Sequence, residues 1–118
     1  MANAVRWFEI AAKDPNAVKG FYAELFDWKW EDLEGDMPYS TVEAADGGIP
    51  GGIGGTPDDY PGHVTFYVAV DDLEAALSKV ESLGGSRMMG PMDIPNGQIA
   101  LFNDPEGHTI GLMHMNDG

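Results

Sequence analysis

Hydrophobic and polar positions follow two different periods in the first thirty residues, which predicts a strand followed by a helix. Residues 5–12, VRWFEIAA, are rich in aromatic and β-branched residues and stop before Asp14-Pro15, an N-cap residue followed by proline at the first helical position. Apolar residues then recur at i, i+3, i+4, i+7 and i+8, the spacing of a helix that packs on one face. This stripe consists of Val18, Phe21, Tyr22, Leu25 and Phe26. We expect it to face a sheet.

The same succession of patterns returns in the second half of the chain. Residues 64–70, VTFYVAV, predict another strand, and Asp72 is the N-cap candidate of a second amphipathic helix that ends at Gly84-Gly85. Asp14 and Asp72 lie 58 positions apart, and at this offset the strands and the helices of the two halves align in phase. We therefore interpret the chain as an internal duplication.

Short strand-like segments separated by turn residues follow each predicted helix. They cover residues 28–32, 37–43 and 49–55 in the first half, and residues 86–92, 98–103 and 108–115 in the second half. Each half therefore has the pattern βαβββ. The chain is expected to be a single domain that consists of module one at 4–55, a linker rich in Pro, Gly and Asp at 56–62, and module two at 63–115.

Composition excludes several classes of function. The 118 residues suffice for one domain with a buried core. A net charge of −14 would repel phosphate backbones and anionic lipid surfaces, so we expect neither a nucleic-acid nor a membrane partner. The absence of cysteine excludes disulfides, thiolate zinc sites and cysteine nucleophiles. Because no apolar run is long enough for a membrane span and no signal-peptide pattern is present, we expect a cytoplasmic protein.

Four segments carry a resemblance to a known family. They are WFEI at 7–10, DPNAVKGFYAELFDW at 14–28, VDDLEAAL at 70–77 and LFNDPEGHTIGL at 101–112. In this order and spacing the chain resembles the vicinal oxygen chelate superfamily, which includes glyoxalase I, the bleomycin-resistance proteins and the extradiol dioxygenases. The resemblance implies an α+β fold in which two βαβββ modules, related by a pseudo-twofold axis, form a curled, cup-like mixed sheet. The cup of such proteins holds a small molecule and often a divalent metal.

The resemblance also implies four metal-ligand positions, on the first and last strands of both modules. The first-strand positions fall on Trp7 and Thr65, and an indole or a neutral hydroxyl is a poor metal ligand. The last-strand glutamates would fall near Gly52 and at Gly111, so both carboxylates are missing. We therefore expect no metal and no cofactor, which argues against glyoxalase I or extradiol dioxygenase chemistry.

Strand alternation divides the first strands of the two modules into a helix-packed side and a cup side. The helix-packed side carries Phe8, Ile10, Phe66, Val68 and Val70. On the cup side, Trp7 and Glu9 join His63, Thr65 and Tyr67. If an antiparallel register relates Trp7 to Thr65, His63 lies opposite Glu9.

Three interpretations of the pair Glu9 and His63 stay open. His63 can be an exposed residue at the mouth of the cup beside a glutamate that makes a structural hydrogen bond. The two can instead form an acid–base pair, catalytic through Glu9 as general base, or they can be metal ligands at non-standard places.

We expect the cup to bind its small molecule through an apolar and aromatic wall. The candidate ligand-binding residues are Trp7, Trp28, Trp30, Tyr39, Thr65, Tyr67, Phe102 and Met113. We interpret the chain as a metal-independent protein that binds a small hydrophobic or aromatic molecule, as the bleomycin-resistance branch does. The alternatives are a glyoxalase-like lyase or isomerase that uses Glu9 as base, and a purely structural or regulatory domain. A second copy of the chain, in a homodimer, is the expected protein partner.

Overall fold

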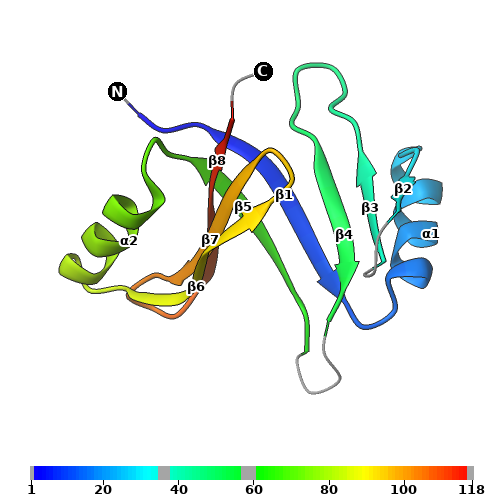
Figure 1. The fold of residues 1–118 in the computed structure, drawn as a ribbon. Helices are drawn as coiled ribbons and strands as arrows, with labels where there is room; N and C mark the ends of the chain where they lie inside the picture. The colour runs from blue at the N-terminus through cyan, green and yellow to red at the C-terminus, as the bar shows by residue number, and fades with distance from the viewer. Residues whose placement is uncertain (1, 35–37, 57–60, 117–118) are drawn as a thin grey trace. The chain divides into compact units, whose positions relative to one another are not determined.

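The computed structural model describes residues 2–34, 38–56 and 61–116. Two compact units are present (Figure 1). The α1 unit is Trp7–Thr65, and the α2 unit is Met1–Arg6 with Phe66–Gly118. Each unit contains one helix and its own hydrophobic core.

The first βαβββ run lies almost entirely within the α1 unit. Its elements are β1 (Val5–Ala12), α1 (Pro15–Phe26), β2 (Glu31–Leu33), β3 (Tyr39–Val42) and β4 (Gly51–Gly55). The strand order is β2-β3-β4-β1, in which β1 runs parallel to β4 and the other neighbours are antiparallel. The order of these elements confirms the predicted pattern of the first half.

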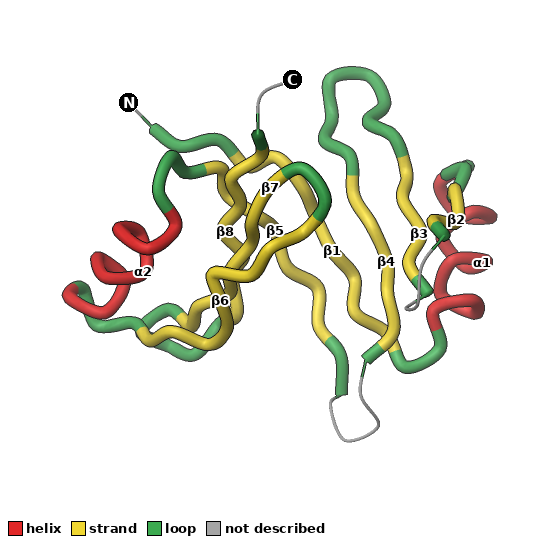
Figure 2. The backbone as a smooth tube through the Cα atoms, viewed as in Figure 1, coloured by secondary structure: helices red, strands yellow, loops and turns green. Residues whose placement is uncertain are grey.

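The second run repeats this arrangement. Its elements are β5 (His63–Ala69), α2 (Leu73–Ser82), β6 (Ser86–Ile94), β7 (Gly97–Asn103) and β8 (Thr109–Met115). The strand order is β5-β8-β7-β6, again with the first strand parallel to the last and the remaining neighbours antiparallel. Figure 2 shows one helix and its strands in each half of the chain. The α+β class and the two βαβββ modules are thus as predicted.

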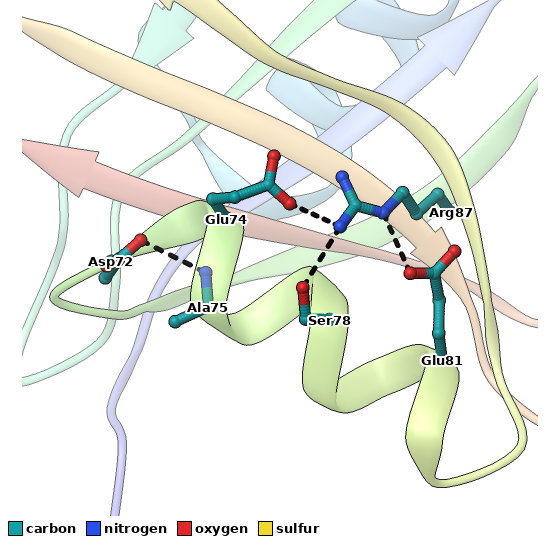
Figure 3. Close-up of polar contacts among 6 residues, drawn as sticks. All are labelled: Asp72, Glu74, Ala75, Ser78, Glu81 and Arg87. Atoms are coloured by element: carbon teal, nitrogen blue, oxygen red, sulfur yellow. Dashed lines mark hydrogen bonds and ion pairs between the residues drawn. The ribbon is translucent and has the colours of Figure 1, made fainter.

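Both helices begin at the predicted capping residues. The Asp14 carboxylate accepts a hydrogen bond from the backbone N–H of Ala17 at 3.2 Å, and Pro15 is the first helical residue. The Asp72 carboxylate accepts from the backbone N–H of Ala75 at 3.1 Å in the same way (Figure 3). Each cap satisfies one of the N–H groups that a helix start leaves without an intrahelical partner.

A cluster of polar contacts ties α2 to strand β6 (Figure 3). Arg87 on β6 donates to the Glu81 carboxylate at 3.1 Å and to the Ser78 hydroxyl at 3.2 Å, and it also forms an ion pair with Glu74. The hydrogen bond from Arg87 holds the pKa of the Glu74 carboxyl below its usual range. One side chain therefore fixes three positions along the helix against the sheet.

The two cores lie between each helix and its strands. In the α1 unit, the buried residues Ile10, Ala12 and Ile53 pack with Phe8, Val18, Tyr22 and Trp30. In the α2 unit, the buried residues Leu73, Leu77, Ala100 and Leu112 pack with Val68, Val70, Ala76 and Phe102. The predicted helix-packed side of the first strands is confirmed for Phe8, Ile10, Val68 and Val70. Phe66, the fifth residue predicted on this side, is instead 40% exposed.

Part of the predicted apolar stripe of α1 does not pack on the sheet. Val18 and Tyr22 join the core, whereas Phe21 is 61% exposed and Leu25 is 58% exposed. The Trp28 ring packs against Phe8 of β1 and against Tyr22 and Phe26 of α1. The aromatic contacts between α1 and the strands are therefore made along the edge of the stripe that carries Tyr22 and Phe26. Only one edge of the stripe is therefore needed to cover the strands.

Strand boundaries differ from the prediction most clearly at β2. This strand covers only Glu31–Leu33, because Trp28 and Trp30 turn toward α1 instead of extending the sheet. Met37 of a predicted strand and residues 57–60 of the predicted linker lie outside the described residues. Within the described part of the chain, every helix is too short or too polar to cross a bilayer.

Candidate functional site

The face of the α1 unit that points away from α1 carries the polar residues of the candidate site. Across β3, β4 and β1, Thr41 pairs with Gly52 and Gly52 pairs with Glu9. Residues that pair directly lie on the same side of a sheet, so these three share one face. Phe8, the strand neighbour of Glu9, points to the opposite side and packs in the α1 core.

Two hydrogen bonds connect three predicted site residues on this face. The Trp7 indole N–H donates to the Tyr39 hydroxyl at 3.2 Å, and the Tyr39 hydroxyl donates to Glu9 Oε2 at 3.0 Å. All three side chains are half-buried. Trp7 and Glu9 come from β1 and Tyr39 comes from β3, so the hydroxyl bridges over the intervening strand β4. We name this arrangement the Tyr39 relay.

Glycines in β4 make the space that the relay occupies. A Cβ atom at Gly52 would lie 2.1 Å from the Tyr39 hydroxyl oxygen, and one at Gly54 would lie 2.9 Å from the Tyr39 ring. No side chain larger than hydrogen fits beneath the ring at Gly52 without displacing it. The relay therefore depends on small residues in the strand between its two ends.

Sequence reasoning missed the contact between Tyr39 and Glu9, although it named both residues. The signal that could have found it is the run Gly51-Gly52-Ile53-Gly54-Gly55 in a predicted strand. Glycine inside a strand often marks the close approach of another group. Here that group is the ring of Tyr39, which comes from the neighbouring strand.

His63 and Thr65 also belong to the α1 unit, at the start of β5. His63 is half-buried and Thr65 is only 4% exposed. Thr65 is therefore buried, and its role in ligand binding stays a prediction. The opposition of Glu9 and His63 stays a prediction.

A second tyrosine covers a glycine in the α2 unit. Tyr67 on β5 is 4% exposed and pairs with Gly111 on β8, where an added Cβ would lie 2.4 Å from the Tyr67 ring. Met113 pairs with Ala69 and lies on the same face as Tyr67. Phe102 lies on the other face, because it packs with the core beneath α2.

Trp28 and Trp30 lie on the α1 side of their unit, away from the Tyr39 relay. The centroid of the Trp28 ring is 5.5 Å from that of Phe8 and 5.0 Å from that of Phe26. The Trp30 indole N–H donates to the backbone carbonyl of Lys19 at 3.2 Å. A left-handed residue at the helix end, Asp27 with φ 59°, reverses the chain and brings both indoles back against α1.

The four positions at which the family would hold a divalent metal do not fit one. Trp7 offers an N–H donor that Tyr39 already accepts, and Thr65 offers only a neutral hydroxyl. Gly52 and Gly111 have no side chain, and tyrosine rings occupy the space beside them. Within residues 2–34, 38–56 and 61–116, no group of three or more His, Cys, Asp or Glu side chains could hold a metal ion.

Comparison with known proteins identifies the family. The family model of the Glyoxalase/Bleomycin resistance protein/Dioxygenase superfamily matches residues 4–112. The chain belongs to this superfamily. This assignment confirms the resemblance seen in the sequence motifs.

Individual relatives agree with this assignment. The anthracycline biosynthesis protein DnrV of Streptomyces peucetius is 32% identical over an aligned length of 127, and the alignment covers 92% of this chain and 46% of the relative. A glyoxylase-like domain-containing protein of Didymella fabae is 32% identical over 115 residues, with 88% of each chain covered. The chain spans only 45–46% of the length of four curated relatives that it matches.

A solved structure shows the same fold at low sequence identity. Methylmalonyl-CoA epimerase from Mycobacterium tuberculosis matches with a TM-score of 0.69 and 15% identity, covering 96% of this chain and 88% of the epimerase. At this identity the likeness establishes the fold and not the activity. It confirms the predicted fold class.

Proposed function

We propose that this domain binds a small hydrophobic or aromatic molecule at the face of the Tyr39 relay, without a divalent metal at the positions that the family uses. The observation that carries the proposal is the pair of hydrogen bonds from Trp7 to Tyr39 and from Tyr39 to Glu9. Trp7 lies at an expected metal-ligand position, and Glu9 pairs with Gly52, near which another is expected. Both residues are engaged in hydrogen bonds within the protein.

The residues of the relay match the chemistry of a small-molecule site. Such sites combine an apolar wall with a few fixed polar groups that orient the ligand. The Trp7 indole and the Tyr39 ring supply flat apolar surface, and the hydroxyl and carboxylate supply the polar groups. Because all three side chains are half-buried, each keeps surface that a ligand can cover.

The names of the relatives suggest which ligands to test first. DnrV is named for anthracycline biosynthesis, so an anthracycline belongs in the first panel of aromatic compounds. Its planar rings could lie against the Trp7 indole, as aromatic rings do in offset-stacked pairs. Simple phenols and naphthols would test whether one or two rings suffice.

Binding is measured by the quenching of tryptophan fluorescence and by the shift in Tm, with a chelator present throughout. We expect at least one aromatic compound to raise Tm and to lose about tenfold in affinity in the variant Trp7→Phe. The matched control is Phe21→Leu, which changes an exposed aromatic residue on the opposite side of the unit. The absence of binding by every compound in the panel would contradict the proposal.

A second candidate function is that of a lyase or isomerase in which Glu9 removes a proton from carbon. The hydrogen bond from Tyr39 favours it, because this bond fixes the direction of the Glu9 carboxylate beside the proposed ligand surface. The solved epimerase shares the fold. The test is whether the protein exchanges a carbon-bound hydrogen of the substrate for deuterium from the solvent. Loss of this exchange in Glu9→Gln, while the variant still binds the ligand, would support this function over binding alone.

The remaining expectations about the whole protein stay predictions. They are the homodimer, the cytoplasmic location and the boundaries of the two modules. The proposed function does not depend on any of them.

A further inference from the structure

A pocket lies on the α1 side of the α1 unit. Its volume is about 330 Å³, which is within the range of about 300–1,000 Å³ that is usual for small-molecule sites. The pocket is lined by Phe8, Trp28, Val42, Glu43, Ala45, Gly48 and Ile49. We name it the Trp28 pocket.

The strand register places the Trp28 pocket on the side of the sheet opposite the Tyr39 relay. Phe8 and Val42 both pair with Gly51, so the three residues share a face. The Phe8 ring covers Gly51, where an added Cβ would lie 2.2 Å from the ring. Glu9 follows Phe8 in the strand and points the other way. The two sites therefore share no side chain.

Aromatic surface and one carboxylate dominate the wall of this pocket. The Phe8 and Trp28 rings are tilted by 37° with centroids 5.5 Å apart, and both are only half-buried. Glu43 is the one ionisable residue among the described lining residues, and its side chain is exposed. Within the described part of the chain, Glu43 forms no ion pair.

Two lysines of the α1 unit, among the residues that the structure describes, are held by other partners. Lys29, which follows Trp28 in sequence, is held by the Asp27 carboxylate at 2.8 Å. Lys19, on α1, is held by Asp32 and Ser40. Aromatic faces beside an available carboxylate attract a positively charged group, because both the ring quadrupole and the carboxylate favour it.

We propose that the Trp28 pocket binds an organic ammonium ion with an apolar body, such as an arylalkylamine. The apolar body lies against Val42, Ile49 and the aromatic rings, and the ammonium group lies toward Glu43. The net charge of −14 adds a long-range attraction for cations. This inference is independent of the proposed function, since it concerns the other face of the sheet.

The test compares three probes of similar size and different charge: phenylethylammonium, phenylpropanol and phenylpropanoate. Binding is followed by NMR through the three tryptophan indole N–H signals, assigned with single Trp→Phe variants. We expect phenylethylammonium to shift the Trp28 signal and to bind about threefold to tenfold more tightly than phenylpropanol, with phenylpropanoate weakest. Equal affinity of the cation and the alcohol would overturn the proposal.

Two variants separate the charge of the pocket from its shape. Glu43→Gln should weaken phenylethylammonium about threefold to fivefold and leave phenylpropanol unchanged. Glu106→Gln, which removes the same charge from the exposed β7–β8 turn of the α2 unit, is the matched control. Ala45→Leu should fill the pocket and weaken both probes, and an unchanged Tm shows that the fold is intact. Equal effects of the two Glu→Gln variants would contradict a role for Glu43.

Failure of this inference and failure of the proposed function give different results. Trp7→Phe should leave phenylethylammonium binding unchanged, because Trp7 does not line the Trp28 pocket. A shift of the Trp7 signal by phenylethylammonium, with no shift of Trp28, would overturn the inference and assign the amine to the relay face.

Discussion

Tyr39 is the residue on which the candidate site depends. Its hydroxyl accepts from Trp7 and donates to Glu9, so a single oxygen connects an aromatic surface with a carboxylate. A neutral phenol can do both at once, whereas an ionised carboxylate can only accept. The position of the Glu9 carboxylate is thus controlled by a group on a strand that does not adjoin its own.

Tyr39→Phe should break both hydrogen bonds while keeping the ring. We expect a loss of about 1 kcal/mol in the free energy of unfolding, since the bonds are partly buried. The Trp7 indole N–H signal should also move in the NMR spectrum. Tyr22→Phe is the matched control, because the Tyr22 ring packs on Phe26 and its hydroxyl forms no hydrogen bond within the described residues. Equal losses in the two variants would show that the relay does not stabilise the fold.

Gly52 provides a second test at the scale of one residue. Gly52→Ala places a methyl group 2.1 Å from the Tyr39 oxygen, so the Tyr39 side chain must be displaced from the position in which it donates to Glu9. We expect a loss of about 1–3 kcal/mol in the free energy of unfolding and loss of aromatic ligand binding. In contrast, Gly20→Ala in helix α1 meets no atom within 4 Å and should stabilise the protein by about 0.5–1 kcal/mol. Denaturant unfolding of both variants measures the difference, and a neutral Gly52→Ala would contradict the described packing.

The sequence predicted the members of the relay better than their connections. Strand alternation correctly placed Glu9 on the side opposite Phe8. The bond between Tyr39 and Glu9 was missed, because the order of strands β3, β4 and β1 is not evident from the sequence and the glycine run of β4 was not interpreted as a sign of close approach. Such a contact depends on the strand order and on the absence of side chains at the glycines between them.

Among the secondary-structure elements, the helix starts were the most predictable. Capping is a local interaction, so Asp14 and Asp72 identified the first turns without knowledge of the sheet. The amphipathic stripe of α1 predicted more burial than the structure shows, since a hydrophobic period does not tell how much of the stripe the neighbouring strands cover. Trp28 and Trp30 were assigned to a strand for a related reason, because their aromatic character fits a strand as well as a helix-packed loop.

Arg87 links two elements, and its removal should weaken the attachment of α2 to the sheet. Arg87→Gln loses the ion pairs with Glu74 and Glu81, so we expect a lower Tm at neutral pH and a difference from wild type that decreases in high salt. Lys13→Gln removes the same charge from a side chain that forms no ion pair within the described residues. A similar Tm for the two variants would show that the Arg87 contacts contribute nothing.

The effect of Arg87 should also depend on pH in a defined direction. The pKa of Glu74 is lowered from its ordinary value of 4.5 in the folded protein, chiefly by the hydrogen bond from Arg87. The folded state therefore gains stability above about pH 4.5 and loses it as the pH falls and the carboxyl takes up its proton. The difference in Tm between wild type and Arg87→Gln should decrease in acid. A difference that grows as the pH falls would contradict this assignment.

At the scale of the molecule, membership of the superfamily establishes the fold without establishing the chemistry. The family model matches residues 4–112, yet the four positions expected to hold a metal carry an indole, a hydroxyl and two glycines. Function resides in such sites more than in the fold that carries them. The duplicated βαβββ pattern could be predicted because it is repeated along the chain, whereas the pocket beside Trp28 depends on how a loop, a helix end and a strand meet.

The most direct test of the central claim is to follow the Trp7 indole N–H signal during titration with an aromatic ligand, once with a chelator and once with added zinc or manganese. If the site binds without a metal, we expect the same ligand-dependent shift and the same affinity in both titrations, and no stoichiometric metal in the purified protein. Binding that requires a tightly held metal, and that a chelator abolishes, would contradict the account.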